Sequence, residues 1–341
     1  MRKLLTATAA LALTQLAVVN GATYPATLAG CLAFAALFDN TCTDLSTATD
    51  FSSVASESVS CTGDVAYCAG SWDSTGSTCT WTRKLCVTCS TTNSVTYIRV
   101  QTNSLPNRCY YAGVDTPVSQ SFDFKVKFNW DASAESTNTA VTSVATANTA
   151  NCATATGMSS KIPTNAKFTN SGTKTLESVG VALDGLLLNP SINSDQVDIF
   201  YPPDSYLTYT YSNNNQSNFD HCMSHSTGDG YYHYHGASPC VGNTALQGDT
   251  PYKCYSLTSC WGKYVDYIEA NWPASLTVFG LAKDGHIIWG PYDSNGDTFD
   301  ACDLDYCNGG TIDGVYGYAA TAYHPHIPAC YGPASSRGSY Q

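Results

Sequence analysis

The feature that most constrains this chain is its cysteine content. Sixteen cysteines occur in 341 residues, eight between Cys31 and Cys109 and eight between Cys152 and Cys330. An even number divided evenly predicts a disulfide framework in two separately cross-linked regions, which requires an oxidising compartment. Cys86 and Cys89 form a C-x-x-C pair, a spacing that redox and zinc sites also use, but among so many cysteines we interpret it as part of the framework.

The N-terminus predicts the same compartment. Met1-Arg2-Lys3 is a short basic start, an apolar run follows over residues 4–19, and the small residues Gly21 and Ala22 come next. This pattern is typical of a secretory signal peptide, which we assign to residues 1–22. The rest of the chain has no apolar stretch of membrane-spanning length, so we expect a secreted protein without a membrane anchor.

Charge and aromatic content exclude other classes. The net charge is −12, and the 15 Lys and Arg residues form no basic run, so we expect no nucleic-acid partner. The 23 tyrosines argue against a disordered chain.

Composition divides the mature chain into two parts. Residues 23–110 are rich in Cys, Ser and Thr, lack histidine and are predicted to form a small Cys-rich module. Residues 111–341 are predicted to form a larger β-domain. The alternation of Phe122, Phe124, Val126 and Phe128 with polar residues predicts a half-buried strand. Residues 131–171 form either extended strands with polar turns or a loop that carries O-glycans, and Asn215 begins an N-glycosylation sequon.

The second part contains an internal repeat. Residues 179–190 resemble residues 279–288, and in each copy two apolar runs flank an Asp-Gly pair, which is typical of a β-hairpin turn. Residues 219–222 and 229–234 likewise resemble residues 299–302 and 313–318. We therefore predict a mainly β, disulfide-rich fold with a pseudo-twofold, β-sandwich-like C-terminal domain.

Histidines are concentrated in this repeat, and all seven follow residue 220. If residues 232–235 form a strand, His233 and His235 face one side and the tyrosines face the other. His225, across a Gly-Asp-Gly turn, is positioned to be a third ligand, and three imidazoles suit Zn(II) or Cu(II). The simpler interpretation, which the sequence alone favours, is that these histidines form structural hydrogen bonds.

The tetrapeptide Tyr232-His233-Tyr234-His235 also carries a family resemblance. The other elements that carry the resemblance are Asp220, Cys222 and His225 upstream, a Gly280…Asp284-Gly285…Gly290-Pro291 element, and Cys307-Asn308-Gly309. The chain resembles the YHYH-domain family over roughly residues 120–333. The resemblance implies a fold and an extracellular setting rather than a reaction. The chain departs from the family pattern where Ser224 replaces a glycine and where Tyr316-Gly317-Tyr318-Ala319 lacks histidines.

Weaker candidates complete the set. His324-Pro325-His326 is a second His-x-His, which we interpret as two exposed histidines in preference to a partner of the first cluster, and His286 follows a hairpin turn. Asp293, Asn295 and Asp297 begin like a calcium loop, but Leu304 occupies the position of the bidentate glutamate, so only a weak Ca(II) site remains possible. The hydrolase motifs Gly-x-Ser-x-Gly and His-Glu-x-x-His are absent, whereas a carboxylate pair for glycoside hydrolysis is identified only by its separation in the fold.

Two functions follow from these patterns. The sequence favours a structural or interaction protein of an extracellular layer, matrix or fibre, whose partners are proteins, glycans or copies of itself. The alternative is a metal-dependent extracellular enzyme, an oxidoreductase or hydrolase, that uses His225, His233 and His235.

Overall fold

A computed structural model describes the greater part of the chain. The described residues are 23–62, 67–68, 71–72, 78–110, 117–130, 178–191, 199–200, 219–226, 230–249, 253–254, 264–299, 303–304, 307–323, 325–328 and 331. The predicted signal peptide, the Ser/Thr-rich segment 131–171, Asn215 and His324 lie outside them.

The elements before residue 130 form the N-terminal part, which is built from antiparallel strands, one short α-helix and one turn of 3-10 helix. β5 and β6 form a long hairpin, and β7 adds to it as the third strand of a sheet, while β1 pairs with β4 and β2 with β3. The strand expected from Phe122 is β7, and its buried and exposed residues alternate as predicted. The elements are α1 (Leu28–Ala35), η1 (Phe51–Ser53), β1 (Glu57–Thr62), β2 (Tyr67–Cys68), β3 (Ser71–Trp72), β4 (Thr78–Arg83), β5 (Leu85–Thr92), β6 (Val95–Thr102) and β7 (Phe122–Lys127).

The C-terminal part contains an eight-stranded mixed sheet in the order β11-β12-β9-β8-β14-β15-β17-β16. Its strands are β8 (Gly180–Ala182), β9 (Leu187–Leu188), β11 (Ser224–Ser226), β12 (Tyr232–Tyr234), β14 (Val278–Ala282), β15 (Ile287–Trp289), β16 (Gly309–Ile312) and β17 (Val315–Ala319). Outside it lie β10 (Phe219–Asp220), which pairs with β13 (Lys253–Cys254), and the helices α5 (Pro239–Gly242), η5 (Thr244–Gly248) and α6 (Tyr264–Asn271).

The order of these eight strands shows the predicted twofold repeat. The antiparallel pair β8 and β14 lies at the centre, and Val181 pairs with Leu281, its equivalent in the repeat. On one side β9 runs parallel to β12, which pairs antiparallel with β11; on the other β15 runs parallel to β17, which pairs antiparallel with β16. The expected mainly β, disulfide-rich fold is therefore confirmed, whereas a sandwich arrangement is not confirmed.

Each predicted Asp-Gly hairpin is present, with a three-residue loop. Ala182 and Ala282 close the two loops through backbone hydrogen bonds to residues 186 and 286. The left-handed conformation falls on the glycine of each pair, since Gly185 has φ +86° and Gly285 has φ +90°. A glycine in that position is the usual end of a three-residue hairpin loop.

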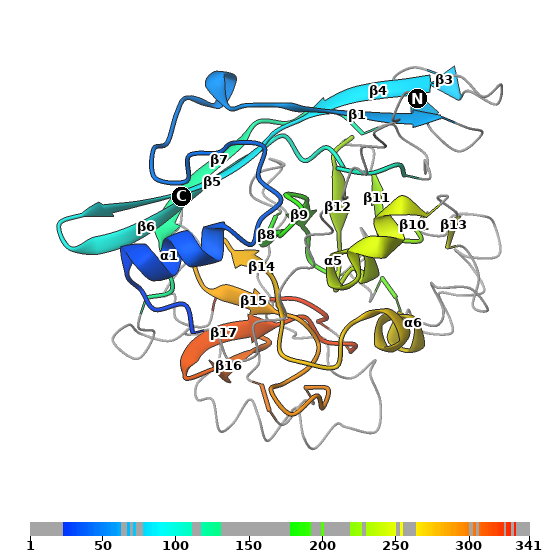
Figure 1. The fold of residues 1–341 in the computed structure, drawn as a ribbon. Helices are drawn as coiled ribbons and strands as arrows, with labels where there is room; N and C mark the ends of the chain where they lie inside the picture. The colour runs from blue at the N-terminus through cyan, green and yellow to red at the C-terminus, as the bar shows by residue number, and fades with distance from the viewer. Residues whose placement is uncertain are drawn as a thin grey trace, which may run out of the picture.

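The large sheet is covered on both faces (Figure 1). On one face Tyr234, Ile288 and Tyr318 pack in a cluster with Ile268 of α6. On the other, side chains of the large sheet join α1 and the β5–β7 sheet in a second cluster, which includes Phe34, Val87, Ile98, Val126, Val181, Leu281 and Ile287. The N-terminal and C-terminal parts thus share this second cluster. The boundary at residue 110 stays a prediction.

Each disulfide that the structure describes at both ends lies within one of the two predicted cysteine groups. The four bridges whose two ends are described are Cys31–Cys89, Cys42–Cys86, Cys61–Cys109 and Cys222–Cys240. Cys86 and Cys89 pair with different partners, so the C-x-x-C belongs to the framework. Within the described residues, no helix combines the length and the apolar character needed to cross a bilayer.

Candidate metal centre

The three predicted histidines lie on two neighbouring strands. β11 and β12 pair antiparallel with His225 directly opposite His233, and His235 follows the end of β12. Because successive side chains of a strand alternate, His233 and His235 share one face and the intervening Tyr234 occupies the other. Ring contacts join all three imidazoles, with centroids 4.7–5.2 Å apart. The pattern of residues 232–235 therefore predicted these side-chain directions correctly.

The imidazoles point their Nε2 atoms at one another. His235 Nε2 lies 3.0 Å from His233 Nε2 and 3.1 Å from His225 Nε2. Nitrogen ligands at about 2.0–2.1 Å from a tetrahedral zinc ion would be separated by about 3.3 Å. These two distances are therefore close to those between ligands of one ion, and the candidate ligand atoms of all three histidines lie within 4.8 Å of one another.

Backbone carbonyls fix the tautomers of two of these rings. His233 Nδ1 lies 3.0 Å from the carbonyl oxygen of Tyr231, and His235 Nδ1 lies 2.6 Å from that of Pro190. A carbonyl oxygen only accepts, so each Nδ1 carries the proton and donates it. In the neutral rings both Nε2 atoms are then acceptors, with their lone pairs directed at each other. Such outer contacts are typical of metal-binding histidines.

Burial keeps the cluster neutral. His225, His233 and His235 are 8%, 0% and 6% exposed, and Phe219 packs on His225 with ring centroids 4.6 Å apart. Burial lowers the pKa of His235 to about 4. Burial and the nearby imidazoles also place the pKa of His225 and His233 well below the usual value. A proton is therefore a poor bridge between these nitrogens at neutral pH.

The opposite face of β12 carries a polar network that the sequence did not predict. Arg108 reaches into the C-terminal part and forms an ion pair with Asp184 at 2.8 Å. Its guanidinium also donates to the hydroxyl of Tyr234, which donates in turn to Asp184 at 2.6 Å. Tyr232 donates to Asp220 on the same face. These residues come from segments far apart in the chain, so no local pattern indicates the contact.

All charges in this network are buried. Arg108 is 3% exposed. Burial alone would lower the pKa of Arg108, but the surrounding oxygens of Tyr234, Tyr232, Asp184 and Asp220 hold it above its usual value. The guanidinium therefore stays protonated and balances the carboxylates, which would otherwise lie buried without a counter-charge.

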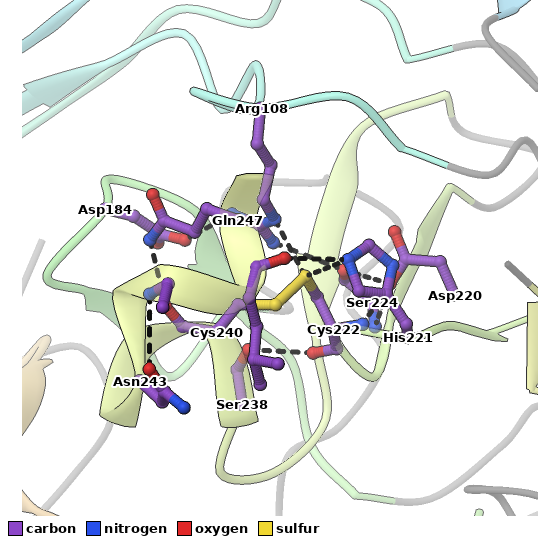
Figure 2. The surroundings of a disulfide bond; sticks show 12 residues. Arg108, Asp184, Asp220, His221, Cys222, Ser224, Ser238, Cys240, Asn243 and Gln247 are labelled. Carbon is purple, nitrogen blue, oxygen red and sulfur yellow. Dashed lines mark hydrogen bonds and ion pairs between the residues drawn. A yellow bond between two sulfur atoms is a disulfide. The ribbon is translucent and has the colours of Figure 1, made fainter. Parts of the chain in front are cut away.

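The Cys222–Cys240 disulfide lies beside this network (Figure 2). Arg108 Nε donates to Cys222 Sγ at 3.0 Å, and His221 Nε2 lies 3.5 Å from the same sulfur. His221, Cys222 and Cys240 are close enough to hold a metal ion. Both sulfurs are committed to the disulfide, however, and the adjacent guanidinium would repel a cation. We therefore assign this group a structural role.

The second half of the sheet has no histidine in the corresponding strand positions. The pair His225–His233 of β11 and β12 corresponds to the pair Gly310–Gly317 of β16 and β17. Ala319 stands where His235 would be. The departure from the family pattern noted in the sequence thus removes all three potential ligands from this half.

The remaining candidates are dispersed. Asp293 Oδ1 accepts the backbone N–H groups of Asn295 and Asp297 at 2.8 and 2.9 Å, as in a self-capped turn. The predicted calcium site there is not tested by this arrangement.

His286 pairs with Asp284 at 3.0 Å. His326 is fully buried, which contradicts its interpretation as an exposed residue, because it packs at right angles to Phe200.

Comparison with known protein families finds a match to the part of the chain that carries this site. The family described as YHYH protein matches residues 159–302, which include β8 to β15 and all three histidines. The match confirms the resemblance seen in the sequence over a somewhat shorter range. No curated protein and no solved structure matches the chain.

Proposed function

Starting from a disulfide-stabilised chain with a YHYH domain, a combination consistent with an extracellular protein, we propose that the protein is secreted and binds one zinc or copper ion. The ligands are His225, His233 and His235. The observation that carries the proposal is the pair of acceptor nitrogens, His233 Nε2 and His235 Nε2, which face each other at 3.0 Å.

Two acceptor nitrogens at this distance repel unless a cation lies between them. A shared proton is disfavoured because burial lowers the pKa of both rings. A divalent ion accepts a lone pair from each nitrogen and gains a third from His225. Imidazole nitrogen is a common ligand for zinc and copper.

The internal repeat provides independent support. Gly310, Gly317 and Ala319 occupy the corresponding positions of the second half, whose strands pair in the same order. Imidazoles are therefore not needed to form this arrangement of strands. Their presence in the first half is better explained by a ligand than by folding.

Three protein ligands leave a coordination position for water or a substrate, the arrangement of catalytic rather than structural zinc sites. A bound ion would supply Lewis acidity or, for copper, electron transfer. The metal-dependent enzyme suggested by the sequence is thus compatible with the cluster. The extracellular structural role remains a separate proposal, which rests on composition and on the disulfide framework.

Metal analysis of the full chain, purified from a secreting host, tests the proposal. We expect about one zinc or copper ion per chain, lost in His233→Ala. A chelator should lower the unfolding temperature of the wild type, because a ligand present at 1,000 times its Kd stabilises the folded state by about 4 kcal/mol. The chelator should not affect His233→Ala.

His286→Gln is the matched control, since it also removes a buried histidine, but from the half without the cluster. It should retain the ion. A wild type that stays metal-free after incubation with excess zinc and copper would refute the proposal. If that metal-free protein self-assembles, the structural role gains support instead.

A further inference from the structure

Among the described residues of the eight-stranded sheet and its ends, one buried polar atom on the same face as the imidazoles has no hydrogen-bond partner. Asn189 is 7% exposed, and its Nδ2 donates to the hydroxyl of Tyr231 at 2.6 Å. Its carbonyl oxygen, Asn189 Oδ1, is buried without a hydrogen bond. A buried acceptor left unsatisfied costs about 1–3 kcal/mol, so such an atom calls for an explanation.

Strand register places Asn189 next to His235. β9 and β12 are parallel, with Leu187 beside His233 and Leu188 beside Tyr234. The hydrogen bond from Asn189 N to the carbonyl oxygen of Tyr234, at 2.8 Å, continues this ladder by one step. Laterally paired residues of a sheet project to the same face, so the Asn189 side chain lies on the face of the imidazoles.

The direction of the amide supports this placement. Asn189 starts beside His235, and its amide reaches the hydroxyl of Tyr231, whose ring lies 5.0 Å from the ring of His233. The Asn189 amide therefore lies alongside the cluster, next to His233 and His235. Pro190, which follows Asn189, accepts the Nδ1 proton of His235 and ties the same segment to the site.

We propose that Asn189 is a positioning residue of the metal site, and that Asn189 Oδ1 accepts a hydrogen bond from a water or hydroxide bound to the ion. This inference rests on the metal site proposed above and extends it. A metal-bound water needs an acceptor, and Oδ1 is a buried acceptor without a donor. A small ligand that replaces this water would then bind more tightly if it can donate a hydrogen bond to Asn189 Oδ1.

The test uses the full chain loaded with Co(II), whose visible spectrum reports coordination, and azide as the competing ligand. Azide has no proton to donate, so in the wild type its binding forfeits the hydrogen bond between water and Asn189. In Asn189→Leu the bound water has no such hydrogen bond to lose. Azide should therefore bind about tenfold more tightly than in the wild type, which corresponds to one hydrogen bond. The cobalt content should stay at one per chain.

Asn189→Asp keeps an acceptor oxygen and adds a charge that repels the anion. It should bind azide no more tightly than the wild type. If Asn189→Leu does not fold, Asn189→Ala, which removes the same acceptor, decides the test. Tyr318→Phe, which alters a buried hydroxyl of the other half, is the control and should leave azide affinity unchanged.

The outcomes separate the two proposals. A wild type that binds no cobalt refutes the metal site itself. Equal azide affinities in the wild type and in the variant that lacks the acceptor overturn the role of Asn189 and leave the metal site intact. The role of Asn189 is also overturned if azide does not change the spectrum of the Co(II)-loaded wild type while the substitution Asn189→Leu does change it. Asn189 Oδ1 would then be a direct ligand of the ion.

Discussion

In both halves of the eight-stranded sheet a tyrosine hydroxyl donates to the aspartate of an Asp-Gly turn. Tyr234 donates to Asp184 in the first half, and Tyr318 donates to Asp284 in the second. The two tyrosines are equivalent in register, since Tyr234 pairs in parallel with β9 and Tyr318 pairs in parallel with β15. The Asp-Tyr contact thus belongs to the frame that the two halves share.

The halves differ in the residues next to these tyrosines. Next to Tyr234 the first half has His233, with its Nε2 directed at a second imidazole, whereas next to Tyr318 the second half has Gly317. The space there is filled, because a Cβ on Gly317 would lie 3.1 Å from Trp289 Nε1. The repeat therefore separates residues that form the shared fold from the histidines that we propose as metal ligands.

The residue beside the aspartate differs as well. Arg108, from outside the repeat, pairs with Asp184, whereas His286, from within the hairpin, pairs with Asp284. Since Asp220 also lies in the network of Arg108 and is fully buried, the first half concentrates more charge. It should therefore depend more strongly on its cation.

The largest expected effect comes from removing that cation. Arg108→Met should lower the free energy of unfolding by about 3–5 kcal/mol, because it leaves Asp184 and Asp220 buried without a counter-charge. His286→Gln, which can still hydrogen-bond, should cost about 1–2 kcal/mol. Denaturant unfolding with the disulfides intact measures both. Equal losses would contradict the stronger dependence of the first half on its buried cation.

A second prediction concerns transfer of histidine to the second half. Gly317→His should destabilise by about 1–3 kcal/mol, because its Cβ would lie 3.0 Å from the carbonyl oxygen of Ile287 and force the packing apart. Gly248→His is the control: its Cβ meets open space, and the cost should stay within about 0.5 kcal/mol. Thermal unfolding measures both, and a Gly317→His variant as stable as the wild type would contradict the filled space.

Local patterns predicted the parts of this comparison that depend on neighbouring residues. Alternation along residues 232–235 gave the directions of the histidines, and the Asp-Gly pairs gave both hairpins. Arg108 could not be predicted, because it lies 76 residues from Asp184 and belongs to no periodic pattern. Asn189 was missed because its place beside His235 depends on the parallel pairing of β9 with β12, which no local spacing encodes.

The last prediction concerns the tyrosine hydroxyls that both halves share. Tyr318→Phe removes one donor to Asp284 and should cost about 1–2 kcal/mol. Tyr234→Phe should cost more, about 2–3 kcal/mol, because this hydroxyl both donates to Asp184 and accepts from Arg108. Unfolding of the two variants and of the double variant measures these costs. The contacts lie in separate halves, so the costs should add to within about 0.5 kcal/mol. Strong coupling between them would mean that the two aspartates act as one network across the β8–β14 pair.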